Sequence, residues 1–284
     1  MSRTRILIAA GMLGAAFAAG WILRPDDRTG PCVVTAGPVT LPDIGEASGI
    51  AVGRRTPGLL WSHNDSLNDA VLFALDSAGA VRGRVRLPIE PRDWEDVSAA
   101  PCPEGDCLYV ADIGDNLLAR RSVRIYRVRE PAPGDAETAP PEMFTATYED
   151  GPHNAEALFV VGSDLYIVTK DRTGALFRAT LPASGSDLTF QRGGELGLAM
   201  VTDAETSRDG AWVVVRTFTQ VYFYRTVDLT RGAYVPVLQV PLDGLNEPQG
   251  EGVALDGGLL FLVSEGHPRE SGGSVITLSC NLKG

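Results

Sequence analysis

Short apolar runs separated by polar turn residues follow one another through most of the chain. Runs of this length, bounded by Gly, Pro, Asp or Asn, are typical of β-strands. The predicted strands form four groups of four and one group of three: 48–52, 59–62, 71–75 and 81–87; 97–99, 107–111, 123–128 and 144–148; 157–161, 165–169, 175–179 and 188–191; 205–207, 211–216, 221–225 and 234–240; 252–255, 259–264 and 274–278. The pattern therefore predicts an all-β fold.

Five glutamates open these groups at regular intervals of 49, 61, 49 and 46 residues: Glu46, Glu95, Glu156, Glu205 and Glu251. A period of this size is that of a propeller blade, a four-stranded antiparallel sheet repeated around a central channel. We predict a five-bladed β-propeller in which a strand at residues 33–41 supplies the outer strand that the last group lacks and so closes the ring. The alternative is a β-sandwich, which also has short strands but predicts no such repeat.

The N-terminal segment differs from the rest in composition. Arg3 and Arg5 precede an apolar run over residues 6–23. This is the pattern of a signal peptide, and the run is also long enough to remain as a membrane anchor. Both alternatives place the domain outside the cytoplasm, as a secreted, periplasmic or anchored protein. We expect residues 1–24 to form this segment, 25–31 a short linker and 32–281 a single propeller domain.

Charge narrows the range of partners. Without residues 1–24 the chain keeps 22 basic and 36 acidic residues, a net charge of −14. Such a surface disfavours nucleic acid as a partner. We expect a monomer that contacts a membrane only through its N-terminal segment and takes a small-molecule or surface ligand.

The four cysteines predict two disulfides, because the chain carries an export signal. Cys102 and Cys107 flank a turn sequence and would join the two strands of a hairpin. Cys32 and Cys280 lie at the two ends of the predicted fold, so their pairing would close the ring. Neither pair has the spacing of a zinc site.

In a propeller, the loop that leads into each first strand lies on the same face as the end of each second strand. All five glutamates should therefore open on one face. The second strands and their following loops bring further polar residues to it: His63, Asn64, Asp65, Asp112, Asp115, Asn116, Lys170, Thr217 and Glu265. All three histidines of the chain, His63, His153 and His267, fall on this face.

Carboxylates that converge on a narrow channel raise one another's pKa, so a cation is expected to neutralise them. Ca²⁺ prefers six to eight oxygen ligands. Its candidate ligands here are Glu46, Asp112, Asp115, Asn116, Glu156, Glu205 and Glu251. The alternative is structural: the glutamates would accept hydrogen bonds from the neighbouring blade, and the Asp112 to Asn116 segment would form a turn that satisfies its own backbone.

Other residues on this face suggest catalysis or binding. His63 and His153 are candidate general bases. Lys170, Arg216 and Asn64 could bind substrate, although pairing with the acidic ring is the simpler role for the two cations. The chain has no nucleophile elbow, phosphate-binding loop, dinucleotide fingerprint or zinc-protease helix.

The segments Glu46-Ala47-Ser48-Gly49, Asn154-Ala155-Glu156-Ala157 and Gly250-Glu251-Gly252-Val253, with the acidic turn from Asp112 to Asn116, resemble those of exported bacterial β-propellers of the phytase-like and gluconolactonase-like groups. Those groups generally have six blades, whereas five are predicted here. The resemblance implies a divalent ion at one end of the channel that binds substrate oxygens. Two hypotheses follow: a Ca²⁺-dependent hydrolase of an ester, lactone or phosphoester, and a non-catalytic binding propeller with structural glutamates.

Overall fold

A computed structural model describes residues 31–65, 67–182, 187–266 and 272–282. The regular secondary structure of this part is β-strand throughout, apart from one short helix, α1 (Thr226–Leu229). No helix among the described residues is long and apolar enough to cross a membrane. The predicted signal or anchor (1–24), the predicted linker up to residue 30 and His267 lie outside the described residues.

Three of the sheets have four strands each. One contains β2 (Ala47–Val52), β3 (Leu59–Asn64), β4 (Val71–Asp76) and β5 (Val81–Arg86). Another contains β14 (Val201–Thr206), β15 (Trp212–Thr217), β16 (Gln220–Arg225) and β17 (Leu238–Pro241). The third has the order β1 (Cys32–Leu41), β20 (Gly273–Cys280), β19 (Leu259–Glu265) and β18 (Gln249–Asp256).

The fourth sheet has eight strands and consists of two antiparallel runs of four. The first run is β6 (Asp96–Cys102), β7 (Gly105–Asp112), β8 (Val123–Arg129) and β9 (Glu142–Tyr148). The second is β10 (Ala155–Val161), β11 (Asp164–Thr169), β12 (Ala175–Thr180) and β13 (Leu188–Glu195). The runs join where β13 and β9 pair in parallel over three residues, Leu188 to Phe190 against Ala146 to Tyr148. The all-β prediction is therefore confirmed.

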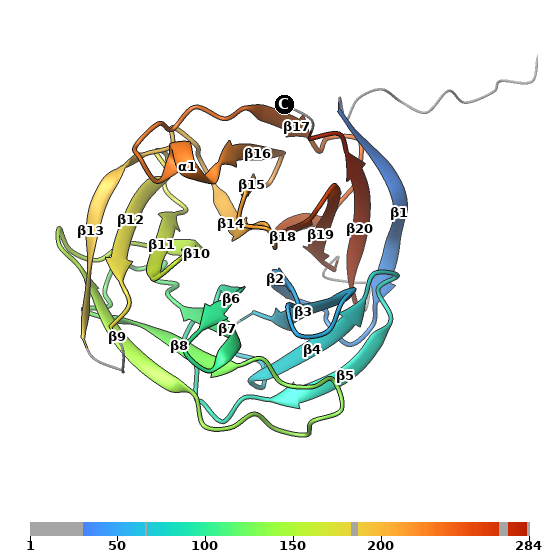
Figure 1. Cartoon of the computed structure of the whole chain (residues 1–284), viewed down its shortest axis with the longest axis horizontal. Coiled ribbons are helices and arrows are strands. Elements are labelled where there is room, and N and C mark those ends of the chain that lie inside the picture. Colours follow the sequence, from blue (N-terminus) through green and yellow to red (C-terminus); the bar gives the residue numbers. More distant parts are fainter. Residues whose placement is uncertain (1–30, 66, 183–186, 267–271, 283–284) are drawn as a thin grey trace, which may run out of the picture.

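The strands that begin each run lie nearest the centre of the molecule, and the later strands lie progressively further out (Figure 1). The inner strands contact one another in the cyclic order β2, β6, β10, β14 and β18. Because neighbours cover both faces of an inner strand, its residues are buried almost without interruption, as in β2 and β14. Outer strands such as β9 instead alternate buried and exposed residues.

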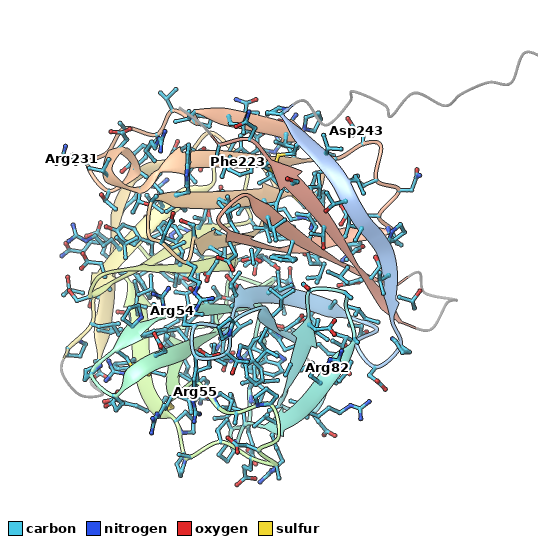
Figure 2. The ribbon with its side chains drawn as sticks, turned by 45° about the vertical axis from the view of Figure 1, so that its right-hand side comes forward. Arg54, Arg55, Arg82, Phe223, Arg231 and Asp243 are labelled. Atoms are coloured by element: carbon cyan, nitrogen blue, oxygen red, sulfur yellow. A yellow bond between two sulfur atoms is a disulfide. The ribbon has the colours of Figure 1, made fainter. Side chains whose placement is uncertain are left out.

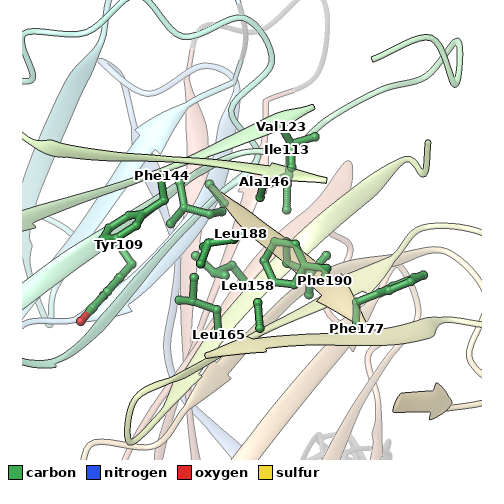
Figure 3. Close-up of a cluster of buried hydrophobic side chains, with 14 of the residues drawn as sticks. Tyr109, Ile113, Val123, Phe144, Ala146, Leu158, Leu165, Phe177, Leu188 and Phe190 are labelled. Atoms are coloured by element: carbon green, nitrogen blue, oxygen red, sulfur yellow. The ribbon is translucent and has the colours of Figure 1, made fainter. Parts of the chain in front are cut away.

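Hydrophobic clusters fill the spaces between neighbouring runs of strands. One of them packs the β6–β9 run against the β10–β13 run, with Phe144, Leu158 and Phe190 at its centre (Figure 3). Phe223, which is fully buried, belongs to the corresponding cluster between the β14–β17 and β18–β20 strands. Arg231 and Asp243 lie at the molecular edge (Figure 2). Burial of apolar surface between the runs is the main stabilising force of such a fold.

The N-terminal strand and both disulfides are as the sequence predicts. β1 pairs with β20, the last strand, and Cys32 is joined to Cys280 across this pair. Cys102 and Cys107 are joined within the β6–β7 hairpin. Two disulfides fit an oxidising, extracytoplasmic environment. Both lie where first strands end and second strands begin, and we call this side of the molecule the stapled end.

Candidate functional site

Three glutamates occupy one structural position at the opposite side of the molecule, where the first strands begin. They are Glu95, Glu156 and Glu251. Each directly precedes a residue that pairs with the second strand of its run: Asp96 with Ala111, Ala157 with Val168 and Gly252 with Val263. Glu156 and Glu251 lie at register shifts of their strands. We call this side of the molecule the acidic end.

The other two glutamates are not equivalent to these three. Glu46 directly precedes β2 at the same end, but Glu205 lies within β14, which corrects the prediction that all five open on one face. In β14 the residue before the corresponding pair is Thr202, because Asp203 pairs with Arg216. Glu205 lies further along the strand and is fully buried against the Ser98 hydroxyl. The matching residue in β2 is Ser48.

Hydrogen bonds identify Ser48 and Thr202 as counterparts of each other. The Ser48 hydroxyl donates to the backbone oxygen of Glu95 at 2.6 Å, and the Thr202 hydroxyl donates to that of Glu251 at 2.8 Å. Glu46 is two residues earlier than Ser48, is exposed and accepts a hydrogen bond from Asn68 at 2.5 Å. The sequence repeat therefore marks the right strands but the wrong residue in two of them.

A cavity of about 90 Å³ opens at the acidic end among the three equivalent glutamates. Six carboxyl groups and one ammonium group line it, together with two amides and a hydroxyl. The lining residues are Ser48, Asp65, Asp93, Glu95, Asn116, Glu156, Lys170, Gln249, Glu251 and Glu265. We call this cavity the acidic pocket.

Within the acidic pocket, Asp65, Asp93 and Glu95 each present a carboxylate oxygen, and the three oxygens lie within 4.8 Å of one another. Oxygens bound to one Ca²⁺ lie 2.3 to 2.6 Å from it, so about 5 Å is the largest separation that a common ion can bridge. A Cβ atom on Gly114 would collide with the carboxylates of Asp93 and Glu95. Glycine at this position therefore leaves the carboxylates room to converge.

The electrostatics of the pocket reflect burial of several acids together. Burial and the neighbouring Glu156 carboxylate raise the pKa of Glu95 well above its usual range. Burial also raises the pKa of Glu156, although Lys170 opposes the effect from 3.2 Å. Burial raises the pKa of Glu251 to about 8. Near neutral pH the pocket therefore retains protons on some of its carboxyl groups.

Lys170 is the one basic residue among the lining residues. Burial lowers its pKa, but the carboxylates of Glu156 and Glu251 outweigh this effect and raise it overall. Its ammonium group also lies 5.5 Å from the centre of the Phe218 ring. Lys170 is therefore charged and pairs with the acidic ring, the simpler of the two roles that the sequence suggests.

Asp112 and Asp115, two predicted metal ligands, support the backbone around the acidic pocket. Asp112 is fully buried, lies 2.9 Å from the Arg120 guanidinium and accepts a hydrogen bond from the Asp93 amide at 3.0 Å. Asp115 accepts hydrogen bonds from the amides of Ala119 and Arg120 at 2.9 and 2.8 Å. Both carboxylates are thus occupied by protein donors. Asn116, the third residue of this segment, does line the pocket.

Neither candidate histidine among the described residues lines the acidic pocket. His63 is fully buried beside Trp94, and burial lowers its pKa to about 4. Its Nδ1 lies 2.8 Å from the Asn64 backbone oxygen. His153 lies 2.7 Å from Asp150 and packs against Phe177. Within the described part of the chain, therefore, no histidine base lies beside the converging carboxylates.

The two remaining predicted binding residues, Asn64 and Arg216, also face other partners. Arg216 is fully buried and donates to Glu247 at 2.7 Å and to the backbone oxygen of Gly252 at 2.8 Å. The side chain of Asn64 accepts a hydrogen bond from the Glu46 amide at 3.0 Å. Both residues therefore tie neighbouring segments together.

A pair of buried carboxyl groups lies deeper between the inner strands. Asp96 and Asp203 are fully buried and hydrogen bond to each other. Burial, with the neighbouring Asp203 carboxylate, raises the pKa of Asp96 well above its usual range. Burial raises the pKa of Asp203 to about 7. The pair therefore shares a proton at neutral pH.

The stapled end carries basic residues that have defined partners. Arg54 and Arg208 each donate to the backbone oxygen of the other at 3.0 Å, and Arg54 also pairs with Asp106 at 3.1 Å. Buried Glu130 accepts hydrogen bonds from the Arg54 amide at 2.9 Å and the Trp61 indole at 3.0 Å. A cavity of about 250 Å³ lies beside the two arginines.

The ligands predicted from the sequence do not include several residues that line the acidic pocket: Asp65, Asp93, Glu95, Gln249 and Glu265. The signals for some of them are visible in the sequence. Glu95 belongs to the repeat, Asp65 follows a second strand and Glu265 ends one. The ends of the second strands therefore predict the lining of the acidic pocket better than the acidic segment from Asp112 to Asn116 does.

Comparison with known proteins does not assign a family. No protein-family profile matches the sequence, and no curated protein matches it. Among solved structures, a chain of a mitotic checkpoint complex is 13% identical with a TM-score of 0.37, covering 92% of this chain and 68% of its own length. The computationally designed Ika8 protein is 10% identical with a TM-score of 0.38, covering 83% and 71%. The predicted resemblance to phytase-like and gluconolactonase-like propellers stays a prediction.

Proposed function

We propose that this protein is an exported five-bladed β-propeller that binds Ca²⁺ in the acidic pocket and uses it in the hydrolysis of an ester or lactone. The propeller interpretation draws support from the cyclic contacts of the inner strands and from the pairing of β1 with β20. The metal proposal is carried by one observation, the convergence of carboxylate oxygens from Asp65, Asp93 and Glu95 within 4.8 Å.

The chemistry of the donors favours Ca²⁺ over other common ions. The donors are all oxygens, which hard cations prefer, and Asp65, Asp93 and Glu95 come from two loops of different runs of strands. Such an irregular set suits the flexible coordination of Ca²⁺ better than the strict octahedron of Mg²⁺. Asn116 lines the same pocket and would supply a further oxygen.

For hydrolysis, the ion would polarise a carbonyl oxygen of the substrate. The chain's own contribution is a proton. Glu251, whose pKa is about 8, keeps its proton at neutral pH, and one of its oxygens is held by Gln249 at 2.7 Å. Its carboxyl group is thus fixed at the pocket wall, where it would donate its proton to the leaving alkoxide while a water molecule adds to the carbonyl carbon, and the proton lost by that water would restore the carboxyl group. Glu251 replaces the histidines as the candidate acid–base residue.

A non-catalytic binding propeller is the second candidate. It is favoured by the absence of His63 and His153 from the pocket lining. Only the hydrolase requires the cation site, because the glutamates of a binding propeller would be structural. The two candidates differ in whether the purified protein, saturated with Ca²⁺, turns over short esters and lactones and whether Glu251→Gln abolishes that turnover while Ca²⁺ binding persists.

The metal proposal is tested by calorimetric titration of EDTA-treated protein with CaCl₂. We expect one bound ion and a rise in melting temperature, because a ligand that binds only the folded state stabilises it. Asp93→Asn should weaken binding by roughly tenfold or more, since it removes an anionic ligand. Asp69→Asn is the matched control, because Asp69 is an exposed aspartate in a loop of the same end. No binding, or equal losses in the two variants, contradicts the site.

A further inference from the structure

A second cavity adjoins the acidic pocket and shares two of its walls. This cavity has a volume of about 290 Å³, and its lining includes Asp93 and Asn116, which also line the acidic pocket. The rest of its lining is different in character, because it includes the apolar residues Leu67, Leu117 and Ala119. We call this cavity the leucine pocket.

The leucines of this cavity are exposed to an unusual degree for large apolar side chains. Leu117 is 88% exposed and Leu67 is fully exposed. Leu67 and the adjacent residue Leu118 also have positive φ angles, 67° and 51°. A positive φ strains any residue other than glycine, and such strain is often found at functional sites. An apolar surface of this kind beside a polar pocket is typical of a ligand site.

The wall of the leucine pocket is held in place by buried polar groups. Asp115 caps the turn that carries Leu117 through the amides of Ala119 and Arg120. The Arg120 guanidinium in turn donates to the backbone oxygen of Gly114 at 2.8 Å. The exposed leucine is thus presented by a rigid turn, which reduces the entropic cost of ligand binding.

The volumes of the two cavities limit how a single ligand can occupy both. A water molecule takes about 30 Å³, so the acidic pocket of about 90 Å³ holds an ion and one small polar group. An organic ligand that reaches the acidic pocket must therefore extend outside it. The leucine pocket adjoins the acidic pocket, has room for the rest of such a ligand and offers it an apolar wall. The Arg92 side chain also lines it and makes no ion pair with the described residues.

We infer that the leucine pocket binds the aliphatic chain of an ester whose carbonyl group enters the acidic pocket. Arg92 is placed to donate a hydrogen bond to the second ester oxygen. The substrate class is then a short-chain aliphatic ester, and the preference should rise with chain length up to the volume of the cavity. The assignment of the ester's carbonyl group to the acidic pocket rests on the proposed function.

The test is ligand-observed NMR with methyl butyrate and methyl acetate in the presence of CaCl₂ and again in EDTA. Wild-type protein should bind methyl butyrate several-fold more tightly than methyl acetate. Leu117→Asn should remove most of this difference. Val235→Asn is the matched control, because Val235 is 78% exposed on a different part of the surface.

The outcomes separate this inference from the calcium proposal. Protein that binds Ca²⁺ by calorimetry but shows no preference for butyrate, or keeps it in Leu117→Asn, overturns the leucine pocket and leaves the metal site standing. A Leu117-dependent preference in protein that binds no Ca²⁺ supports the leucine pocket and overturns the metal site. If Leu117→Asn and Val235→Asn weaken binding equally, the effect is unspecific and the inference fails.

Discussion

Charged side chains have defined partners at one end of the inner strands, whereas at the other end carboxyl groups crowd together. At the stapled end, Arg54 and Arg208 donate to each other's backbone, and Glu130 accepts hydrogen bonds from the loop after β2 and from Trp61 in β3. At the acidic end, six carboxyl groups surround one ammonium group. Both disulfides lie at the stapled end. The contrast shows that one end of the ring is built for stability and the other carries an excess of like charge that a ligand can neutralise.

The largest effect on stability should come from removing the Glu130 carboxylate at the stapled end. Glu130→Ala leaves the Trp61 indole and the amides of Arg54 and Arg55 without their acceptor. We expect the free energy of unfolding to fall by about 3 to 4 kcal/mol, because a buried donor without a partner loses its full solvation. Urea denaturation measures it.

The control for Glu130 is Glu137→Ala, which removes a carboxylate that is exposed and paired only with surface Arg86. That variant should change stability by less than about 1 kcal/mol. Equal losses in the two variants would contradict the structural role of Glu130.

A smaller effect concerns pH in the presence of EDTA. The pKa of Asp203 is about 7 in the folded protein and near 3.8 when unfolded, so the folded state binds an extra proton between these values. The stabilisation is complete below pH 4 and is lost as the pH rises through 7. We expect the free energy of unfolding to fall by roughly 2 to 3 kcal/mol between pH 5 and pH 8.

Asp203→Asn should flatten this pH dependence, because an amide does not titrate there. Urea denaturation at pH 5 and pH 8 gives the two end points. A wild-type protein that is more stable at pH 8 than at pH 5, or a variant with the wild-type slope, would rule out a shared proton between Asp96 and Asp203.

The smallest effect concerns the ammonium group of the acidic pocket. Lys170→Met removes a positive charge that lies 3.2 Å from Glu156 and repels an incoming cation. Calcium affinity should rise about fivefold, which corresponds to about 1 kcal/mol. Arg231→Met removes an exposed positive charge remote from the pocket and should leave affinity unchanged. Weaker binding in Lys170→Met would mean that the lysine helps to hold the ligand.

The sequence predicts the strands and disulfides well, because each depends on local patterns or on chain ends. It fails on register: β2, β10, β14 and β18 each shift register against their second strands, and no local composition reveals where the shift falls. Glu156 and Glu251 lie at that shift, whereas Glu205 lies three residues after Thr202, which occupies it in β14, and Glu46 lies before the shift in β2. Asp112 and Asp115 resemble metal ligands in sequence, but their donors come from Arg120 and neighbouring amides, which only the folded loop brings together.

The pairing of β1 with β20 also fixes how the molecule can be attached to anything else. Cys32 and Cys280 are joined, so the chain enters and leaves the domain at one place, at the stapled end. A tether or a surface linkage attached beside Cys32 or Cys280 would therefore leave the acidic end on the far side of the domain. A protein immobilised in this way would keep its acidic pocket facing the surrounding medium, open to whatever diffuses past.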